Sequence, residues 1–250
     1  MTRPSFTETT AIVTGASRGF GRAISTTLIQ RGARVIGVAR DRQALDDVRA
    51  ELGPSFTVVV ADATDPVLAP QLIADHRPQL LVLNAGATPH AAALQDQTWA
   101  TFSRNWDVDV RSAFEFPKAA LETPLPPGSS VVSVSSGAAR QGSPLSGGYA
   151  GAKATVSFIS DYARLESERN SLGISFTSVL PKLTSATRLG STFVDAYAAY
   201  AGVDRQAYLG QLGPVLSAVD VGLAVVDLVD QTASPASSYL LTAEGLQALA

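Results

Sequence analysis

The segment Thr14-Gly15-Ala16-Ser17-Arg18-Gly19-Phe20-Gly21 follows a short apolar run at residues 11–14 and leads into a helical stretch at residues 18–30. A glycine-rich turn from a strand into a helix exposes backbone N–H groups at the helix N-terminus, where amides and the helix dipole hold a pyrophosphate well. We expect the first glycine to permit the tight turn, the second to let the phosphates approach, and the third to let the helix pack on the strand. A glycine pattern alone is a weak signal, but its place in the first β-α unit strengthens it. The segment therefore predicts a phosphate-binding turn.

The rest of the chain continues the alternation of short β-rich runs and longer helical stretches. Near-continuous β-branched runs between amphipathic helices indicate strands buried on both faces, and strict alternation implies parallel strands with right-handed crossovers. The sequence predicts a single α/β domain over residues 1–250: a Rossmann-like, doubly wound, mostly parallel seven-stranded sheet with helices on both faces. The expected strands are residues 11–14, 35–39, 56–61, 80–83, 131–134, 174–180 and 238–241, and the main expected helices are residues 18–30, 43–52, 66–75, 98–121 and 148–170.

The bulk composition limits the kinds of partner. The chain has 250 residues, 46% of them apolar, which is enough for one sizeable core. Charged residues make up only 16% and the net charge is -3, whereas nucleic-acid and membrane-surface partners favour a basic face. We therefore predict a small-molecule partner or another copy of the chain, with no nucleic-acid or membrane partner.

The absence of cysteine excludes disulfides, thiolate zinc sites and cysteine nucleophiles. It also fits a reducing compartment, and we expect a cytoplasmic protein. His76 and His90 are the only histidines and lack the spacing of metal ligands, so no metal site is expected. Residues 1–10 contain no apolar run of the kind found in signal peptides, which predicts an unprocessed N-terminus.

The end of the second expected strand bears on the choice of cofactor. In many dinucleotide sites an acidic residue ends this strand and binds the ribose hydroxyls. Here Ala39 stands where that acid is expected, and Arg40 lies 19 residues beyond Gly21. Arg40 and Arg18 offer forked, charged donors that suit a 2′-phosphate, while Asp41 is expected to point away from Arg40. The pattern favours NADP(H) over NAD(H); the alternative is that Arg40 is a solvated strand end.

A second cluster consists of Ser136, Tyr149 and Lys153. Tyr149 and Lys153 are four residues apart and share a helix face, and Ser136 follows the fifth expected strand, at the sheet edge where open α/β sheets place ligands. A free phenol has a pKa of about 10, and a neighbouring ammonium and an oxidised nicotinamide both lower it. We predict that Tyr149 protonates the alkoxide that develops as hydride reaches a carbonyl carbon, or takes that proton in reverse, while Ser136 holds the oxygen. The Tyr-Lys pair alone is more often a surface pair; the combination supports the chemistry.

These residues together resemble the short-chain dehydrogenase/reductase family over essentially the whole chain. The resemblance implies that Asn84-Ala85-Gly86 is the family's Asn-Ala-Gly segment and that Asp62 contacts the adenine amino group. By the same resemblance the catalytic residues are Ser136, Tyr149, Lys153 and Asp109. The implied cofactor-binding residues are Gly15, Ser17, Arg18, Gly19, Phe20, Gly21, Arg40, Asp62, Ala63, Asn84, Ala85, Gly86, Tyr149, Lys153, Pro181 and Thr184.

One departure from the family lies at Asp109. Alignment of Phe114 places Asp109 where the family carries an asparagine that helps to hold a water next to the catalytic lysine. An ionised aspartate accepts hydrogen bonds but donates none. If Asp109 is close to the lysine, it raises the lysine pKa and weakens the lysine's tendency to share its proton.

Two further departures lie near the C-terminus. Pro181-Lys182 stands where Pro-Gly is usual, in the segment that lies along the nicotinamide in relatives, and the threonine at Thr184 is slightly out of register. Lysine restricts the backbone there and adds a charge. The final turn, Ala243-Glu244-Gly245-Leu246, lacks the second glycine common in relatives.

The resemblance places a substrate lid at about residues 188–213. Phe193, Tyr197 and Tyr200 are spaced to form one apolar helical stripe there. The stripe either covers a hydrophobic or aromatic carbonyl substrate or packs the lid on the core, and the sequence leaves both alternatives open. Because relatives assemble through the helix at residues 148–170 and its neighbour, the resemblance also implies a homodimer or homotetramer.

The leading hypothesis is an NADP(H)-dependent oxidoreductase that transfers hydride between the nicotinamide and a carbonyl or secondary-alcohol substrate. A catalytically impaired NADP-binding regulator or scaffold is the alternative, kept open by Asp109 and Lys182. Arg18 and Arg40 argue against a third hypothesis, a structural protein that retains only the sheet.

Overall fold

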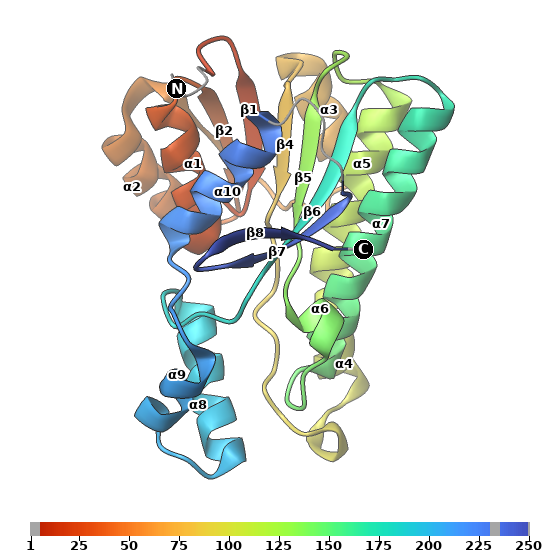
Figure 1. Ribbon diagram of the computed structural model, residues 1–250. Helices are drawn as coiled ribbons and strands as arrows, with labels where there is room; N and C mark the ends of the chain where they lie inside the picture. The colour runs from red at the N-terminus through yellow and green to blue at the C-terminus, as the bar shows by residue number, and fades with distance from the viewer. Residues whose placement is uncertain (1–5, 231–235, 250) are drawn as a thin grey trace.

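The computed structural model describes residues 6–230 and 236–249. Residues 1–5, part of the stretch expected to be an unprocessed N-terminus, lie outside this range. Within it the chain forms one Rossmann-like sheet with helices on both faces (Figure 1). The strands are β1 Thr10–Thr14, β2 Arg34–Ala39, β3 Phe56–Val60, β4 Leu80–Leu83, β5 Ser130–Val134, β6 Ser175–Pro181, β7 Ser238–Thr242 and β8 Gly245–Ala248.

The strand order is β3-β2-β1-β4-β5-β6-β7-β8, so the direction of winding reverses between β1 and β4. All neighbouring pairs are parallel except β7 with β8. Ligands of doubly wound sheets bind outside the carboxyl ends of the strands at such a reversal. The phosphate-binding turn predicted after β1 lies at this place.

The prediction of seven strands was wrong by one. Among the described residues the sheet has eight strands, because the chain turns back after β7 and Gly245–Ala248 pairs antiparallel with it. Gly245 opens this strand with φ 116°, a left-handed backbone that favours glycine. The sequence-based interpretation ended the sheet at residue 241 because β8 is short and half-exposed, without a buried apolar run.

Two hydrophobic clusters hold the helices on the sheet, one on each face. Alternate residues of β1 point to opposite clusters, Val13 to the first and Ile12 to the second, as the period of two in a strand requires. The first cluster packs α1 Gly19–Gln30, α2 Arg42–Leu52 and α10 Ala218–Asp230; the second packs α3 Leu68–His76, α5 Arg111–Glu122 and α7 Gly147–Arg169 (Figure 1).

The helical region predicted at residues 98–121 is not one regular helix. It consists of α4 Trp99–Asn105, a wider π-helical turn η3 Trp106–Val110, and α5. Single π turns inside helices are frequent at functional sites, and this one contains the buried Asp109. Periodicity of apolar residues does not reveal one extra residue in a turn, which is why the sequence predicted only a long helical region.

The region predicted as a lid forms two helices, α8 Arg188–Ala201 and α9 Arg205–Leu212, which extend from the sheet on the side of its carboxyl edge (Figure 1). Thr187 and Asp204 begin these helices, and their side chains accept the N–H groups of Gly190 and Ala207. The remaining short helices are η1 Gly53–Ser55, η2 Leu94–Asp96 and α6 Ala138–Gln141. In the described part of the chain, none of the helices has the length and apolar character needed to cross a membrane.

Candidate active site

The turn after β1, predicted to bind phosphate, is tightly folded and open on one side. Gly15 donates its N–H to the carbonyl of Val38 on β2 at 2.8 Å, which folds the chain tightly at the end of β1. A Cβ at Gly21 would lie 2.2 Å from the Gly15 carbonyl oxygen, so only glycine lets α1 approach the turn this closely. A Cβ at Gly19 would meet nothing within 4 Å, so this side of the turn is open. The backbone therefore leaves room for a ligand beside the N-terminus of α1.

The end of β4 braces the phosphate-binding turn. The Asn84 side-chain amide donates to the carbonyl oxygens of Thr14 and Gly15 at 3.1 and 3.3 Å. In return the Thr14 hydroxyl accepts the N–H groups of Asn84 and Ala85 at 2.9 and 3.0 Å. In this structure Asn84 thus supports the turn from the neighbouring strand, a structural task in addition to the cofactor contact predicted from the sequence.

The guanidinium and the carboxylate expected at the adenosine end face each other. Arg40 Nη1 lies 3.7 Å from Asp62 Oδ2, with 71% of the Arg40 side chain exposed. The other Asp62 oxygen accepts the N–H and the hydroxyl of Thr64. The Thr64 N–H is the main cause that lowers the pKa of Asp62, and Arg40 and Arg111 act in the same direction. Asp41 turns away and begins α2 by accepting the Ala44 N–H.

Lys153 and Asp109 form a buried ion pair. Lys153 Nζ lies 3.1 Å from Asp109 Oδ2 and donates to the Val134 carbonyl oxygen at 3.0 Å. Asp109 Oδ1 accepts the Ala87 N–H at 2.7 Å and the Asn105 side-chain amide at 3.2 Å. Burial is the largest single influence and lowers the pKa of Lys153, but Asp109 and Tyr149 together outweigh it, so the pKa is raised. The expected effect of Asp109 on the lysine is confirmed in direction.

Tyr149 lies on the first turn of α7, next to this pair. Its ring centroid is 5.8 Å from Lys153 Nζ. Burial raises the pKa of Tyr149 by more than Lys153 and Ser136 lower it, so Lys153 acts in the expected direction but the net pKa of the phenol is raised. Asp109 adds to the rise because its negative charge offsets the ammonium. The phenol therefore holds its proton at neutral pH.

Ser136 joins Tyr149 from the end of β5. A hydrogen bond between the two hydroxyls is among the causes that lower the pKa of Tyr149. The Ser136 oxygen also accepts the Ala138 N–H at 3.2 Å, which fixes it at the start of α6. The structure thus brings Ser136, Tyr149, Lys153 and Asp109 together from three places in the fold: the loop after β5, α7, which carries both Tyr149 and Lys153, and η3.

The other residues predicted to bind the cofactor differ in how exposed they are. Thr184, expected near the nicotinamide carboxamide, is buried and donates its hydroxyl to the Leu216 carbonyl. Phe20 packs partly on the first core cluster, and Ala63 belongs to the second. Pro181 is the buried last residue of β6. Arg18 and Gly86 are exposed, while Ser17 and Ala85 are half-buried.

The chain matches the short chain dehydrogenase family over residues 9–197. The chain belongs to this family. Short-chain dehydrogenases are oxidoreductases, so the predicted family, fold and general activity are confirmed.

Individual relatives extend the likeness over the whole chain. The "3-oxoacyl-[acyl-carrier-protein] reductase FabG" of Salmonella typhimurium is 29% identical, covering 96% of this chain and 98% of its own. A Brucella melitensis 3-ketoacyl-(acyl-carrier-protein) reductase complexed with NADH has a TM-score of 0.78 at 20% identity, covering 95% and 98% of the two chains. An NADPH-bound short chain oxidoreductase of Pseudomonas aeruginosa PAO1, described as containing an atypical catalytic center, has a TM-score of 0.80 at 22% identity, covering 94% and 95%. At these identities the two structures show the fold alone.

Three residues of this short-chain dehydrogenase contribute to the site without having been predicted to do so. Asn105 holds Asp109 in place, and its position four residues earlier on the same helical region is a signal that the sequence offers. Ser143 and Ser146 form a hydrogen-bonded pair just before α7, and Ser143 also contacts Tyr197 of the lid. No sequence pattern predicts the contact between Ser143 and Tyr197, because it depends on the conformation of the loop that carries Ser143.

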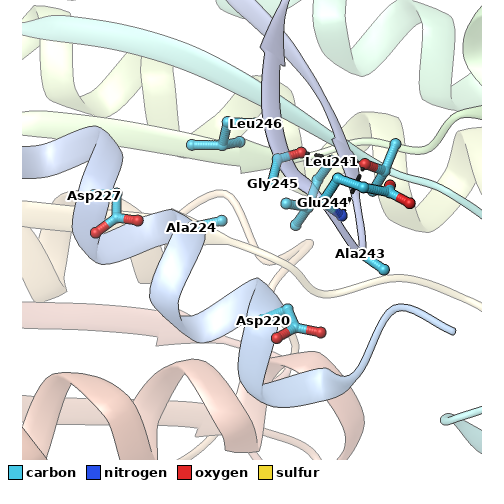
Figure 2. Close-up of a pocket in the computed structure, with 9 residues that line it drawn as sticks. Asp220, Ala224, Asp227, Leu241, Ala243, Glu244, Gly245 and Leu246 are labelled. Atoms are coloured by element: carbon cyan, nitrogen blue, oxygen red, sulfur yellow. Dashed lines mark hydrogen bonds between the residues drawn. The ribbon is translucent and has the colours of Figure 1, made fainter. Parts of the chain in front are cut away.

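A cavity of about 510 Å³ lies apart from these residues, between α10 and the hairpin of β7 and β8 (Figure 2). Asp220, Asp227 and Glu244 line it. Asp220 has a structural task, since its carboxylate accepts the Ser217 N–H at 2.8 Å at the start of α10. None of the predicted site residues lines this cavity, and within the described residues no group of three or more acidic or histidine side chains is arranged to hold a metal ion.

Proposed function

We propose that this short-chain dehydrogenase is an NADP(H)-dependent oxidoreductase acting on a carbonyl or secondary-alcohol substrate, with Tyr149 as the general acid and base. The observation that carries the proposal is the convergence of Tyr149, Ser136 and Lys153 at the sheet edge that also bears the phosphate-binding turn. A proton donor beside a dinucleotide site is the arrangement that carbonyl reduction requires.

The residues present fit the cofactor. The open side of the turn at Gly19 accommodates a pyrophosphate at the N-terminus of α1. Arg18 and Arg40 are exposed and free to reach a 2′-phosphate, although Arg40 must then share or leave Asp62. An ammonium has three donors; Lys153 donates one to Val134 and forms an ion pair with Asp109, so at least one is left for a ribose hydroxyl. When bound, the nicotinamide supplies or accepts the hydride.

Side chains of this protein donate the proton and stabilise the phenolate that remains. Tyr149 keeps its phenolic proton at neutral pH, because burial raises its pKa, and can therefore donate it to a carbonyl oxygen that gains negative charge. Ser136 lies beside this phenol and is placed to hydrogen-bond the same oxygen. Lys153 stabilises the phenolate left behind, and Asp109 keeps Lys153 charged and fixed. Asp109 is thus a positioning residue, because it acts on proton transfer through Lys153.

The test is a set of ketones and alcohols offered with NADPH and with NADH and followed by nicotinamide absorbance. We expect turnover with at least one carbonyl substrate and a preference for NADPH. Tight NADPH binding measured by calorimetry, together with no turnover of any substrate, would contradict the catalytic part of the proposal.

The buried Asp109–Lys153 ion pair is the one observation that favours a regulator with impaired catalysis. It ties the lysine to a carboxylate, and the negative charge of Asp109 raises the pKa of Tyr149, which makes the phenolate harder to form. The two functions differ in one measurement: restoring the family's residue with Asp109→Asn would switch on turnover in a regulator, whereas an enzyme is active without it.

The proposal includes self-association. Phe158, Tyr162 and Leu165 are 68%, 60% and 54% exposed and follow one another at helical spacing on α7, and Phe114 on neighbouring α5 is 50% exposed. Exposed apolar stripes of this kind are typical of protein interfaces. We expect a homodimer or homotetramer through these helices, and Phe158→Ser combined with Tyr162→Ser should reduce the mass measured by light scattering. Freedom from cysteine suits a cytoplasmic location.

A further inference from the structure

A hydrogen bond connects the lid to the loop that precedes Tyr149. The Tyr197 hydroxyl on α8 contacts the Ser143 hydroxyl. Ser143 also contacts Ser146, the residue at which α7 begins and which lies three positions before Tyr149. The lid residue Tyr197 is thereby connected to the start of the helix that presents the proton donor.

Counting donors and acceptors fixes the direction of this bond. A serine hydroxyl has one donor and two acceptor positions. Ser143 accepts the N–H of Ser146 at 3.0 Å and its hydroxyl at 2.8 Å, so both acceptor positions are filled. Ser143 must therefore donate to Tyr197. The phenolic O–H of Tyr197 is left as a donor, and among the described residues no acceptor for it is found other than Ser143.

Neighbouring rings hold Tyr197 in this position. Its ring is stacked on Tyr208 of α9, with centroids 6.2 Å apart and an interplanar angle of 27°. Phe193, which is buried, packs against it at 5.7 Å and 49°. Aromatic pairs at such separations restrict each other. Tyr197 is accordingly a donor with a fixed orientation, half-buried on the side of the molecule that carries the active site.

The surroundings favour a neutral acceptor for this donor. Tyr197 lies close enough to Tyr149 to add to the rise of its pKa, which is caused mainly by burial. Most lid charges are used within the lid: Arg205 pairs with Asp195 and donates to the Ser191 hydroxyl at 3.0 Å, and Asp204 begins α9. Arg188 lies exposed at the start of α8. Arg205, the one lid cation among the described residues that forms an ion pair, is thus already neutralised by Asp195, whereas the Tyr197 hydroxyl offers a neutral carbonyl or ester oxygen a hydrogen-bond donor.

We propose that Tyr197 is a substrate-binding residue that donates a hydrogen bond to a second, uncharged oxygen of the substrate, so that the enzyme selects carbonyl compounds carrying a neighbouring ester or carbonyl group. This inference rests on the proposed oxidoreductase function. It assigns Tyr149 to the oxygen that reacts and Tyr197 to an oxygen that does not.

The test compares ethyl pyruvate and ethyl acetoacetate with 2-hexanone, which has only the reacting carbonyl, in the NADPH reaction. Tyr197→Phe removes the O–H and keeps the ring; we expect a loss of about tenfold in kcat/KM for the preferred keto ester, mostly in KM, since the bond is present before and during reaction. The rate with 2-hexanone should stay within about twofold. Tyr200→Phe is the matched control, because it makes the same change on the same helix at a ring that is 62% exposed. Because Tyr200 is exposed, it is not a buried member of the apolar stripe that the sequence predicted from Phe193, Tyr197 and Tyr200.

A binding measurement separates failure of this inference from failure of the proposed function. Calorimetry of the keto esters with the NADP+-loaded protein reports the hydrogen bond even where no turnover occurs. Weaker binding to Tyr197→Phe, with unchanged binding to Tyr200→Phe, supports the inference whatever the activity. Equal binding to wild type and Tyr197→Phe, absence of keto-ester binding, or equal losses for the keto esters and 2-hexanone would overturn it.

Discussion

The cofactor end and the substrate end of this molecule are built in different ways. At the cofactor end, around the turn after β1, the geometry comes from backbone amides, tight glycine contacts and the bracing amide of Asn84. At the substrate end the geometry depends on individual side chains, above all the Asp109–Lys153 ion pair and the hydroxyl contact between Ser143 and Tyr197. The comparison teaches that a site built from backbone shape depends little on individual side chains, whereas a site built from side chains can change with a single substitution.

The largest effect expected at the substrate end is that of Tyr149→Phe. Removal of the hydroxyl takes away the only proposed proton donor, and kcat should fall by about 10²- to 10⁴-fold. NADPH affinity, measured by calorimetry, should change little, because the cofactor is held mainly at the other end. Unchanged turnover in this variant would refute the role of Tyr149, and a comparable loss of NADPH binding would show that the two ends are not separable.

At the cofactor end, Arg40→Asp should weaken NADPH binding by about 10- to 100-fold, because a charge-assisted bond to the 2′-phosphate is replaced by repulsion. NADH binding should be spared. Arg104→Asp, which makes the same charge change at an exposed position on α4, is the control and should leave both affinities as they are. If wild type already binds NADH more tightly than NADPH, the interpretation of Arg40 is wrong.

Asp109→Asn tests whether Asp109 influences proton transfer through Lys153. Its effect on rate should be smaller than that of Tyr149→Phe, with activity retained or raised by up to about tenfold. Loss of the carboxylate removes one cause that raises the pKa of Tyr149, so this pKa falls. Alcohol oxidation needs the phenolate and should begin at lower pH; carbonyl reduction needs the phenol and should decline at lower pH. Both profiles of kcat/KM against pH are the measurement.

A control for this variant is its thermal unfolding, since Lys153 loses a buried partner and stability should fall by about 3 kcal/mol. The assay temperature must lie below the transition. A large loss of activity in folded Asp109→Asn would show that the carboxylate itself is required, and pH profiles identical to wild type would show that Asp109 does not influence proton transfer.

The smallest effect is expected for Lys182→Gly, which restores the family's residue. Lys182 Nζ donates to the Leu212 carbonyl oxygen at the end of α9 at 3.3 Å, in an exposed position. Exposed bonds of this kind contribute little, so KM for the carbonyl substrate should change by about two- to threefold, with NADPH affinity unaltered. A much larger rise in NADPH affinity would instead show that Lys182 obstructs the cofactor.

The two ends also differ in how far the sequence could predict them. Strand runs such as residues 35–39 are apolar on both faces, and this pattern is enough to assign a parallel sheet and its order of elements. The turn at Gly15–Gly21 was predictable because glycine requirements are local. The strand β8 and the π turn η3 were not, because a short half-exposed strand and one extra residue in a helical turn leave the apolar periodicity almost unchanged.

At the substrate end, residue spacing predicted that Tyr149 and Lys153 share a helix face. It did not predict whether burial or the neighbouring charges would dominate the pKa of the Tyr149 phenol. The direction of its pKa depends on burial and on the distance from Asp109 to Lys153, and both are set by packing between β5, η3 and α7. The bond from Ser143 to Tyr197 joins a loop to a helix 54 positions further along the chain, and no periodic pattern encodes it.

The contact between Thr14 and Asn84 has a consequence for the order in which parts of the protein form during folding. The Thr14 hydroxyl accepts amides from residues 70 and 71 positions further along the chain. Contacts over such separations form late because a long loop must close first. A nascent or truncated chain that ends before β4 therefore holds the complete glycine sequence without its final shape. During refolding, the ability to bind NADPH should appear only once β4 has docked beside β1.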